Sequence, residues 1–185
     1  MDIIDTKNKI FNKNFFLFLI VFILIIVACI LFFVLKTSKN ETAKLQTFSS
    51  SDESVSLSVY DDLGFSEFKD DSYVFALKSS KIDASIFVSK FPTTNIRDIN
   101  KFIEADKNDY ISKFSNINQV SDISEYTVSN LHAYNCHFNY SENMYVDVYW
   151  ILKDSNLYVI DFNINKEKRD LSSQVTEILN SVKFN

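Results

Sequence analysis

The chain has 185 residues, a formal net charge of −5, and only one glycine and one proline. The glycine-rich phosphate loops of the dinucleotide-binding and P-loop types need several glycines, so this composition excludes both. Residues 40–185 carry a net charge of −8, which argues against nucleic-acid binding, because that function needs a basic surface that displaces counterions from phosphates.

A hydrophobic block near the N-terminus is the first element. Residues 1–14 form a short basic tail, and the 21 residues of Phe15–Leu35 follow without a charged side chain. As a helix this block would be about 31 Å long, which matches a hydrocarbon core of about 30 Å. We therefore expect one uncleaved transmembrane helix over residues 15–36, so that the chain is a single-pass protein of the cell membrane.

An alternative anchor is a lipid on Cys29. Ile26-Val27-Ala28-Cys29 resembles a bacterial lipobox, in which the enzyme cuts before the cysteine and acylates it. The apolar run continues past Cys29 to Leu35, which favours the helix, although either outcome anchors the chain. The other cysteine, Cys136, is far away in the sequence, and a spanning block would prevent a disulfide between the two.

The orientation of the block in the membrane is inferred from the short tail. Lysines flank both ends of the block, so the positive-inside rule does not distinguish the two orientations. A short tail before such a block usually stays in the cytoplasm, so we expect the C-terminal part of the chain outside it. Residues 37–53 are polar and lack periodicity, which predicts a flexible linker. The remaining domain, residues 54–185, opens with the alternating residues Val55, Leu57 and Val59, typical of a strand.

Two more strands and a helix follow in this domain. Residues 73–77 and 84–91 are rich in β-branched and aromatic side chains. Beyond Pro92, a helix is expected from an N-cap at Thr94 or Asn95 to about Phe114.

Two hairpins and a helix complete the domain. The first hairpin joins residues 118–128 to 131–140 through Ser129-Asn130, and the second covers residues 144–164. A three-residue loop, residues 154–156, would place all alternating apolar residues of the second hairpin on one face: Val146, Val148, Trp150, Leu152, Tyr158, Ile160, Phe162 and Ile164. Residues 167–181 are amphipathic and predict the last helix.

These elements predict an α+β domain, a mostly antiparallel sheet with two main helices packed on it. Trp150 shares a face with the apolar residues of its strand, so we expect it to be buried between the sheet and the final helix.

The hairpin and the C-terminal end also resemble a known family. The stretch "LYVIDFNI" at residues 157–164 and the closing "ILNSVKF" at residues 178–184 look like the PsbP-like domain. The resemblance covers about residues 54–184. It implies an α/β/α sandwich, a location outside the cytoplasm and non-enzymatic work.

Candidate sites are few. On the outer face of the second hairpin we expect a polar, aromatic strip that suits recognition, made of Tyr145, Asp147, Tyr149, Asp161 and Asn163. His132 and Cys136 share a strand face while His137 points the other way, and we interpret all three as ordinary strand residues. The acidic stretch at residues 61–71 does not have EF-hand spacing and is interpreted as a solvated turn, with a weak cation site as the alternative.

The sequence therefore predicts a non-enzymatic binding or scaffolding module of the cell envelope. It is expected to be held at the membrane by its N-terminal helix and to assist an envelope complex, with an envelope protein as its partner. No catalytic residues, metal or cofactor are expected. The alternative is a domain that senses or binds a small molecule or a cation.

Overall fold

The computed structural model describes residues 25–27, 44–113, 117–167 and 170–185. Residues 25–27 are helical and exposed, whereas the rest of the predicted membrane segment, with Cys29, lies outside the described residues. Within the described part of the chain, no helix is long and apolar enough to cross a membrane. The chain divides into two units, Met1–Ala43 and Lys44–Asn185, and the second unit holds both sheets.

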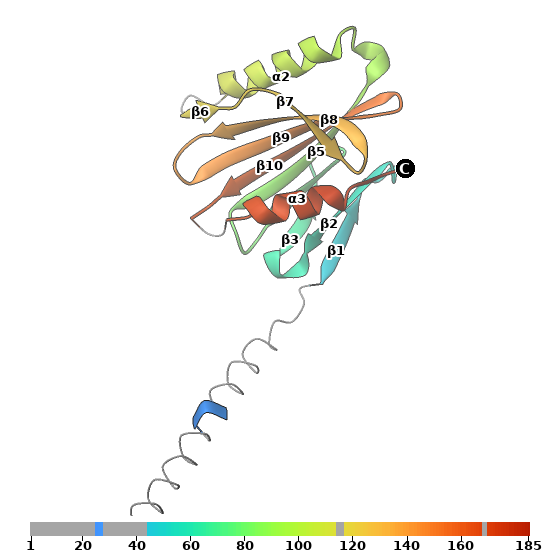
Figure 1. Ribbon diagram of the computed structural model, residues 1–185. Helices are drawn as coiled ribbons and strands as arrows, with labels where there is room; N and C mark the ends of the chain where they lie inside the picture. Colours follow the sequence, from blue (N-terminus) through green and yellow to red (C-terminus); the bar gives the residue numbers. More distant parts are fainter. Residues whose placement is uncertain (1–24, 28–43, 114–116, 168–169) are drawn as a thin grey trace, which may run out of the picture. The chain divides into compact units, whose positions relative to one another are not determined.

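The larger sheet has eight strands in the order β3-β4-β5-β10-β9-β8-β6, with β7 paired to β8 (Figure 1). Its strands are β3 (Phe65–Phe68), β4 (Phe75–Ser79), β5 (Ala84–Pro92), β6 (Gln119–Val120), β7 (Ser124–Val128), β8 (Leu131–Asn139), β9 (Met144–Lys153) and β10 (Asn156–Asn165). Every pairing among these strands is antiparallel. With its helices, the domain is therefore α+β with a mostly antiparallel sheet, as predicted.

The smaller sheet contains β1 (Leu45–Ser49), β2 (Val55–Tyr60) and β11 (Lys183–Phe184), in the order β1-β2-β11. The prediction of a flexible linker is wrong for β1, which pairs with β2 from Leu45↔Tyr60 to Ser49↔Ser56. The side chains of β1 are mostly exposed. A strand without a buried face has no apolar alternation, which is why the sequence pattern did not reveal it.

The helices are α2 (Ile99–Lys113) and α3 (Ser172–Asn180), both shorter than predicted. Thr93–Asn95 forms a 3₁₀ turn, so the expected N-cap at Thr94 or Asn95 is wrong. The Asp98 carboxylate instead accepts the backbone N–H of Lys101 at 3.1 Å, which is the contact of an N-capping side chain.

The two hairpins turn as tightly as an antiparallel sheet allows. Ser129 and Asn130 join β7 to β8 with φ of 50° and 65°, which confirms the predicted turn. The loop between β9 and β10 has two residues, Asp154 and Ser155, because Asn156 already pairs with Lys153. The predicted three-residue loop is therefore wrong.

This shorter loop reverses the expected faces of β9 relative to β10, because a shift of one residue turns every side chain to the other face. Val148 lies opposite Asp161, and Trp150 lies opposite Val159. Both faces are nevertheless apolar, since both are covered. One buried cluster joins the sheet to β2 and to α3 through Val175, Ile178 and Leu179; the other joins it to α2 through Ile103.

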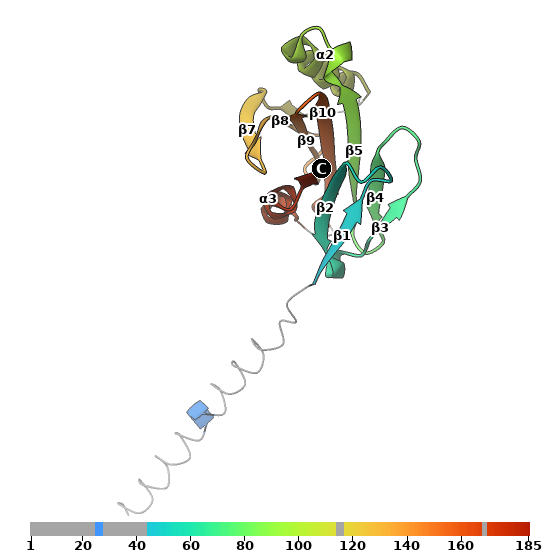
Figure 2. The ribbon, with the colours of Figure 1, turned by 90° about the vertical axis from the view of Figure 1, so that its right-hand side faces the viewer.

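Figure 1 shows α2 and α3 apart, with strands of the large sheet between them, and Figure 2 shows the same arrangement from the side. Trp150 is fully buried, as predicted, but it belongs to the cluster under α2. The prediction that it packs under the final helix is wrong, because the hairpin register points it the other way.

Candidate functional site

The predicted recognition strip is not one surface. Tyr145 and Tyr149 belong to the core beside α3 and are 1% and 7% exposed, so they cannot serve as a recognition surface. Asp161 and Asn163 point to the α2 face with Val159. The two-residue loop between β9 and β10 causes this division, because it places odd-numbered residues of the two strands on opposite faces.

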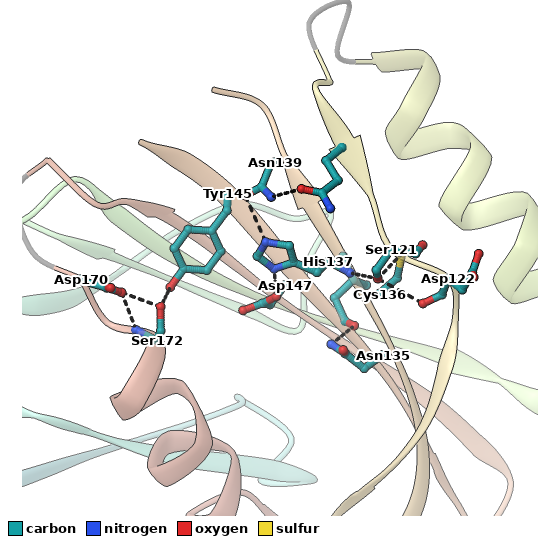
Figure 3. A network of polar contacts seen from close by, with 12 residues as sticks. Ser121, Asp122, Asn135, Cys136, His137, Asn139, Tyr145, Asp147, Asp170 and Ser172 are labelled. Carbon is teal, nitrogen blue, oxygen red and sulfur yellow. Dashed lines mark hydrogen bonds and ion pairs between the residues drawn. The ribbon is translucent and has the colours of Figure 1, made fainter. Parts of the chain in front are cut away.

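Asp147, on the α3 face, takes part in a polar network (Figure 3). Its Oδ1 lies 2.5 Å from Nδ1 of His137, whose Nε2 lies 3.0 Å from Oδ1 of Asn139. The ring of Tyr145 lies 5.3 Å from the His137 ring. The hydrogen bond to Asp147 raises the pKa of His137, although burial acts in the opposite direction. The partners of His137 are thus side chains of its own sheet.

Cys136 is on the other face of β8. Its Sγ lies 3.4 Å from the carbonyl oxygen of Ser121, and burial raises the pKa of its thiol. His132 is exposed and packs edge-on against Tyr134. The three residues that are close in sequence therefore do not converge. Among the described residues, no group of three or more His, Cys, Asp or Glu side chains could hold a metal ion.

The acidic stretch forms turns. Asp61 Oδ1 accepts the backbone N–H of Lys44 at 3.1 Å, and Asp70 Oδ1 accepts that of Ser72 at 2.9 Å. Gly64, with φ of 66°, closes the 3₁₀ turn of Asp61–Leu63. Asp70 bonds the backbone two residues further on, as in an Asx turn, whereas Asp61 bonds the residue that precedes β1.

A cleft of about 400 Å³ lies between the second half of α2 and strands β5 and β10. Four residues of α2 face it at helical spacing: Asp106, Asp109, Tyr110 and Lys113. The opposite wall and the rim are formed by Tyr73, Phe87, Ser89, Phe91, Val159, Asp161 and Asn163. The lining thus combines aromatic rings with a few polar groups, as ligand sites do.

Asp161 is the unusual residue of this cleft. It lies between Phe87 and Val148 in the sheet and is only 7% exposed. The Tyr110 hydroxyl donates a hydrogen bond to its Oδ2, whereas its Oδ1 is buried and has no hydrogen-bond partner among the described residues. Burial raises the pKa of Asp161 to about 7, and the Tyr110 hydrogen bond only partly opposes this. A buried acceptor without a partner is costly, so such groups often mark functional sites.

The neighbours of Asp161 on α2 are also carboxylates. Asp106 Oδ2 accepts the indole N–H of Trp150 at 2.7 Å, and burial raises the pKa of Asp106. Asp109 forms an ion pair with Lys113 at 2.5 Å. The only cation lining the cleft among the described residues is therefore already paired with a carboxylate of its own helix.

Sequence reasoning placed Asp161 in the wrong surroundings and missed Asp106. One indication was present: Asp106, Tyr110 and Lys113 recur at helical spacing, so they share one face of the helix predicted to end at about Phe114. Asp106 lies on that helix face, and Asp161 lies inside the apolar run of residues 157–164. Together they indicate two carboxylates in the same core.

The fold defines the class of this domain. The comparison with solved structures shows a PsbP-like fold. The solution structure of cyanobacterial PsbP (CyanoP) from Synechocystis sp. PCC 6803 is similar over 77% of this chain and 94% of its own, with a TM-score of 0.54 and 10% identity.

A second similar structure is a crystal structure from Bacteroides thetaiotaomicron VPI-5482. It matches 76% of this chain with a TM-score of 0.53 and 12% identity, and the match covers 48% of its own length. No protein-family model and no curated protein matches the sequence. The domain therefore has the PsbP-like fold, which confirms the resemblance found in the sequence.

Proposed function

We propose that the chain is a non-enzymatic binding module of the cell envelope, anchored in the membrane with its domain outside the cytoplasm, and that the cleft beside α2 is its ligand site. The observation that supports binding is the buried Asp161 carboxyl group, whose Oδ1 has no partner among the described residues. Because Asp161 is almost entirely buried yet lines the cleft, a ligand that donates a hydrogen bond to its carboxyl group would recover part of the desolvation cost of that group.

Binding fits the cleft better than catalysis does. Tyr110 hydrogen-bonds Asp161, and burial and that carboxylate raise the pKa of its phenol, so the hydroxyl stays protonated. Lys113 is ion-paired with Asp109. A nucleophilic mechanism needs a deprotonated or activated group beside a base. In this cleft the Tyr110 phenol stays protonated and the Lys113 amine stays charged, so neither group is a nucleophile.

The anchor is supported by the charge-free Phe15–Leu35 block, whose length matches a bilayer. The intact mass of the chain extracted from membranes by detergent distinguishes the two kinds of anchor. We expect the mass of the uncleaved chain. A chain that begins at Cys29 with a diacylglyceryl group would instead make the protein a lipoprotein.

Binding is tested with the full chain in detergent, by native mass spectrometry and thermal shift against small molecules extracted from envelope preparations. A ligand of the cleft should raise the melting temperature, because it binds only the folded state. Ser89→Trp, which fills the cleft from β5, should weaken binding about ten-fold or more, whereas Thr127→Trp on the exposed surface of β7 should not.

The proposal fails if no small molecule binds, or if every bound molecule binds both variants equally. A scaffolding role for an envelope protein partner is the alternative within the same class. A stoichiometric protein that is recovered equally with wild type and with Ser89→Trp would favour scaffolding over ligand binding.

A further inference from the structure

The charges that line the cleft are unbalanced. Asp106, Asp109 and Asp161 contribute three carboxyl groups, and Lys113 contributes one ammonium group. Because Lys113 is paired with Asp109 at 2.5 Å, Asp106 and Asp161 have no cation of their own among the described residues. The cleft therefore favours a ligand of positive charge.

The hydrogen-bonding groups of these two residues point to the same class of ligand. An ionised carboxylate only accepts hydrogen bonds. Asp106 Oδ2 accepts one from Trp150, and Asp161 Oδ2 accepts one from Tyr110. Asp161 Oδ1 has no partner among the described residues, so the group that completes the site is a donor.

The remaining walls are aromatic. Tyr73 and Phe87 pack with ring centroids 4.7 Å apart on the sheet side, and Tyr110 lies on the helix side. The faces of such rings attract organic cations, and carboxylates beside them add directed hydrogen bonds. A cleft of about 400 Å³ is the size of a small-molecule site rather than of a single ion.

We infer that the ligand of this cleft is a small organic cation, a protonated primary or secondary amine whose N–H groups bond the carboxylates of Asp161 and Asp106 while its carbon skeleton packs against the rings of Tyr73, Phe87 and Tyr110. This inference rests on the proposed function and adds the chemical class of the ligand. It assigns Asp161 as the residue that recognises the charge.

Binding of such a ligand depends on the protonation of Asp161. The titratable groups that interact with Asp161 are Asp106, Tyr110 and Lys113 on α2, Tyr73 before β4 and Tyr140 after β8. The pKa of Asp161 is raised to about 7, so more of its carboxyl group is ionised at pH 8 than at pH 6. Affinity for the amine should therefore rise over this range.

The test uses the full chain in detergent and compares pairs of probes by calorimetry. Phenethylamine and 2-phenylethanol have nearly the same shape but differ in charge, and agmatine and spermidine extend the set of amines. At pH 8 at least one amine should bind, and phenethylamine should bind at least about ten-fold more tightly than 2-phenylethanol.

Asp106→Asn is the main variant, because its amide oxygen can still accept the indole N–H of Trp150 while the charge is lost. It should weaken amine binding about ten-fold, and Asp161→Asn should weaken it at least as much. Asp122→Asn, an exposed acid outside the cleft, is the control and should bind as wild type does.

Equal affinity for phenethylamine and 2-phenylethanol overturns the inference, as does the absence of binding by every amine, or amine binding that Asp106→Asn leaves unchanged. Binding of Ca²⁺ or Zn²⁺ in place of the amines also overturns it. If a neutral or anionic molecule binds and Ser89→Trp abolishes that binding, the proposed function stands and only the ligand class is wrong.

Discussion

Trp150→Ala is expected to lower the free energy of unfolding by about 3–5 kcal/mol. Trp150 is fully buried under α2, and its indole N–H donates to Asp106. The change therefore leaves a large cavity and also removes the hydrogen-bond partner of a half-buried carboxylate. A domain of this kind has a total stability of about 5–15 kcal/mol, so much of the fold should be lost.

The measurement is urea denaturation of the full chain in detergent, monitored by circular dichroism. Tryptophan fluorescence cannot monitor the variant, because Trp150 is the only tryptophan. Trp150→Phe is the matched control: it keeps an aromatic ring but loses the N–H, and it should cost clearly less. Native tryptophan emission should be blue-shifted and poorly quenched by iodide. A loss of less than about 1 kcal/mol in the alanine variant would contradict the burial of Trp150.

Asp161→Asn is expected to remove a large part of the pH dependence of stability. The pKa of Asp161 is raised from its ordinary value to about 7 in the folded domain. Between about pH 4 and 7 the folded state therefore holds a proton that the unfolded state releases, so stability falls as pH rises through this range. At about 1.4 kcal/mol per unit, the loss is on the order of 4 kcal/mol.

The difference in unfolding free energy between wild type and Asp161→Asn, measured from pH 4 to 8, isolates this effect. Some other carboxylates act in the opposite direction: hydrogen bonds from Ser50 lower the pKa of Asp52, for example. Their contributions are common to both proteins and cancel. Relative to the variant, wild type should lose stability steadily up to about pH 7. If the difference between wild type and Asp161→Asn is the same at every pH, Asp161 is ionised throughout and the prediction is wrong. The control variant Asp122→Asn should differ from wild type by the same amount at every pH.

The local sequence was sufficient to predict an element where a residue type has a clear backbone preference or where apolar residues recur at a regular spacing. Ser129-Asn130 joins two strands with positive φ at both residues, a conformation that Asn tolerates better than most residues, and the turn was predicted. Val175, Ile178 and Leu179 recur at helical spacing and are buried in α3. Such patterns depend on residues a few positions apart and need no knowledge of the rest of the fold.

By itself, then, the sequence determined the class of fold, most strands and both main helices, and the burial of Trp150. Only the tertiary structure decided which helix covers Trp150 and where Asp161 lies. Apolar alternation identifies the register of a hairpin only when one face of the sheet is buried and the other is solvated. Here α2 covers one face of the sheet, and α3 with β2 covers the other. When both faces are buried, apolar alternation no longer reveals the hairpin register, and one residue of register moves Asp161 from an outer strip to the cleft beneath α2.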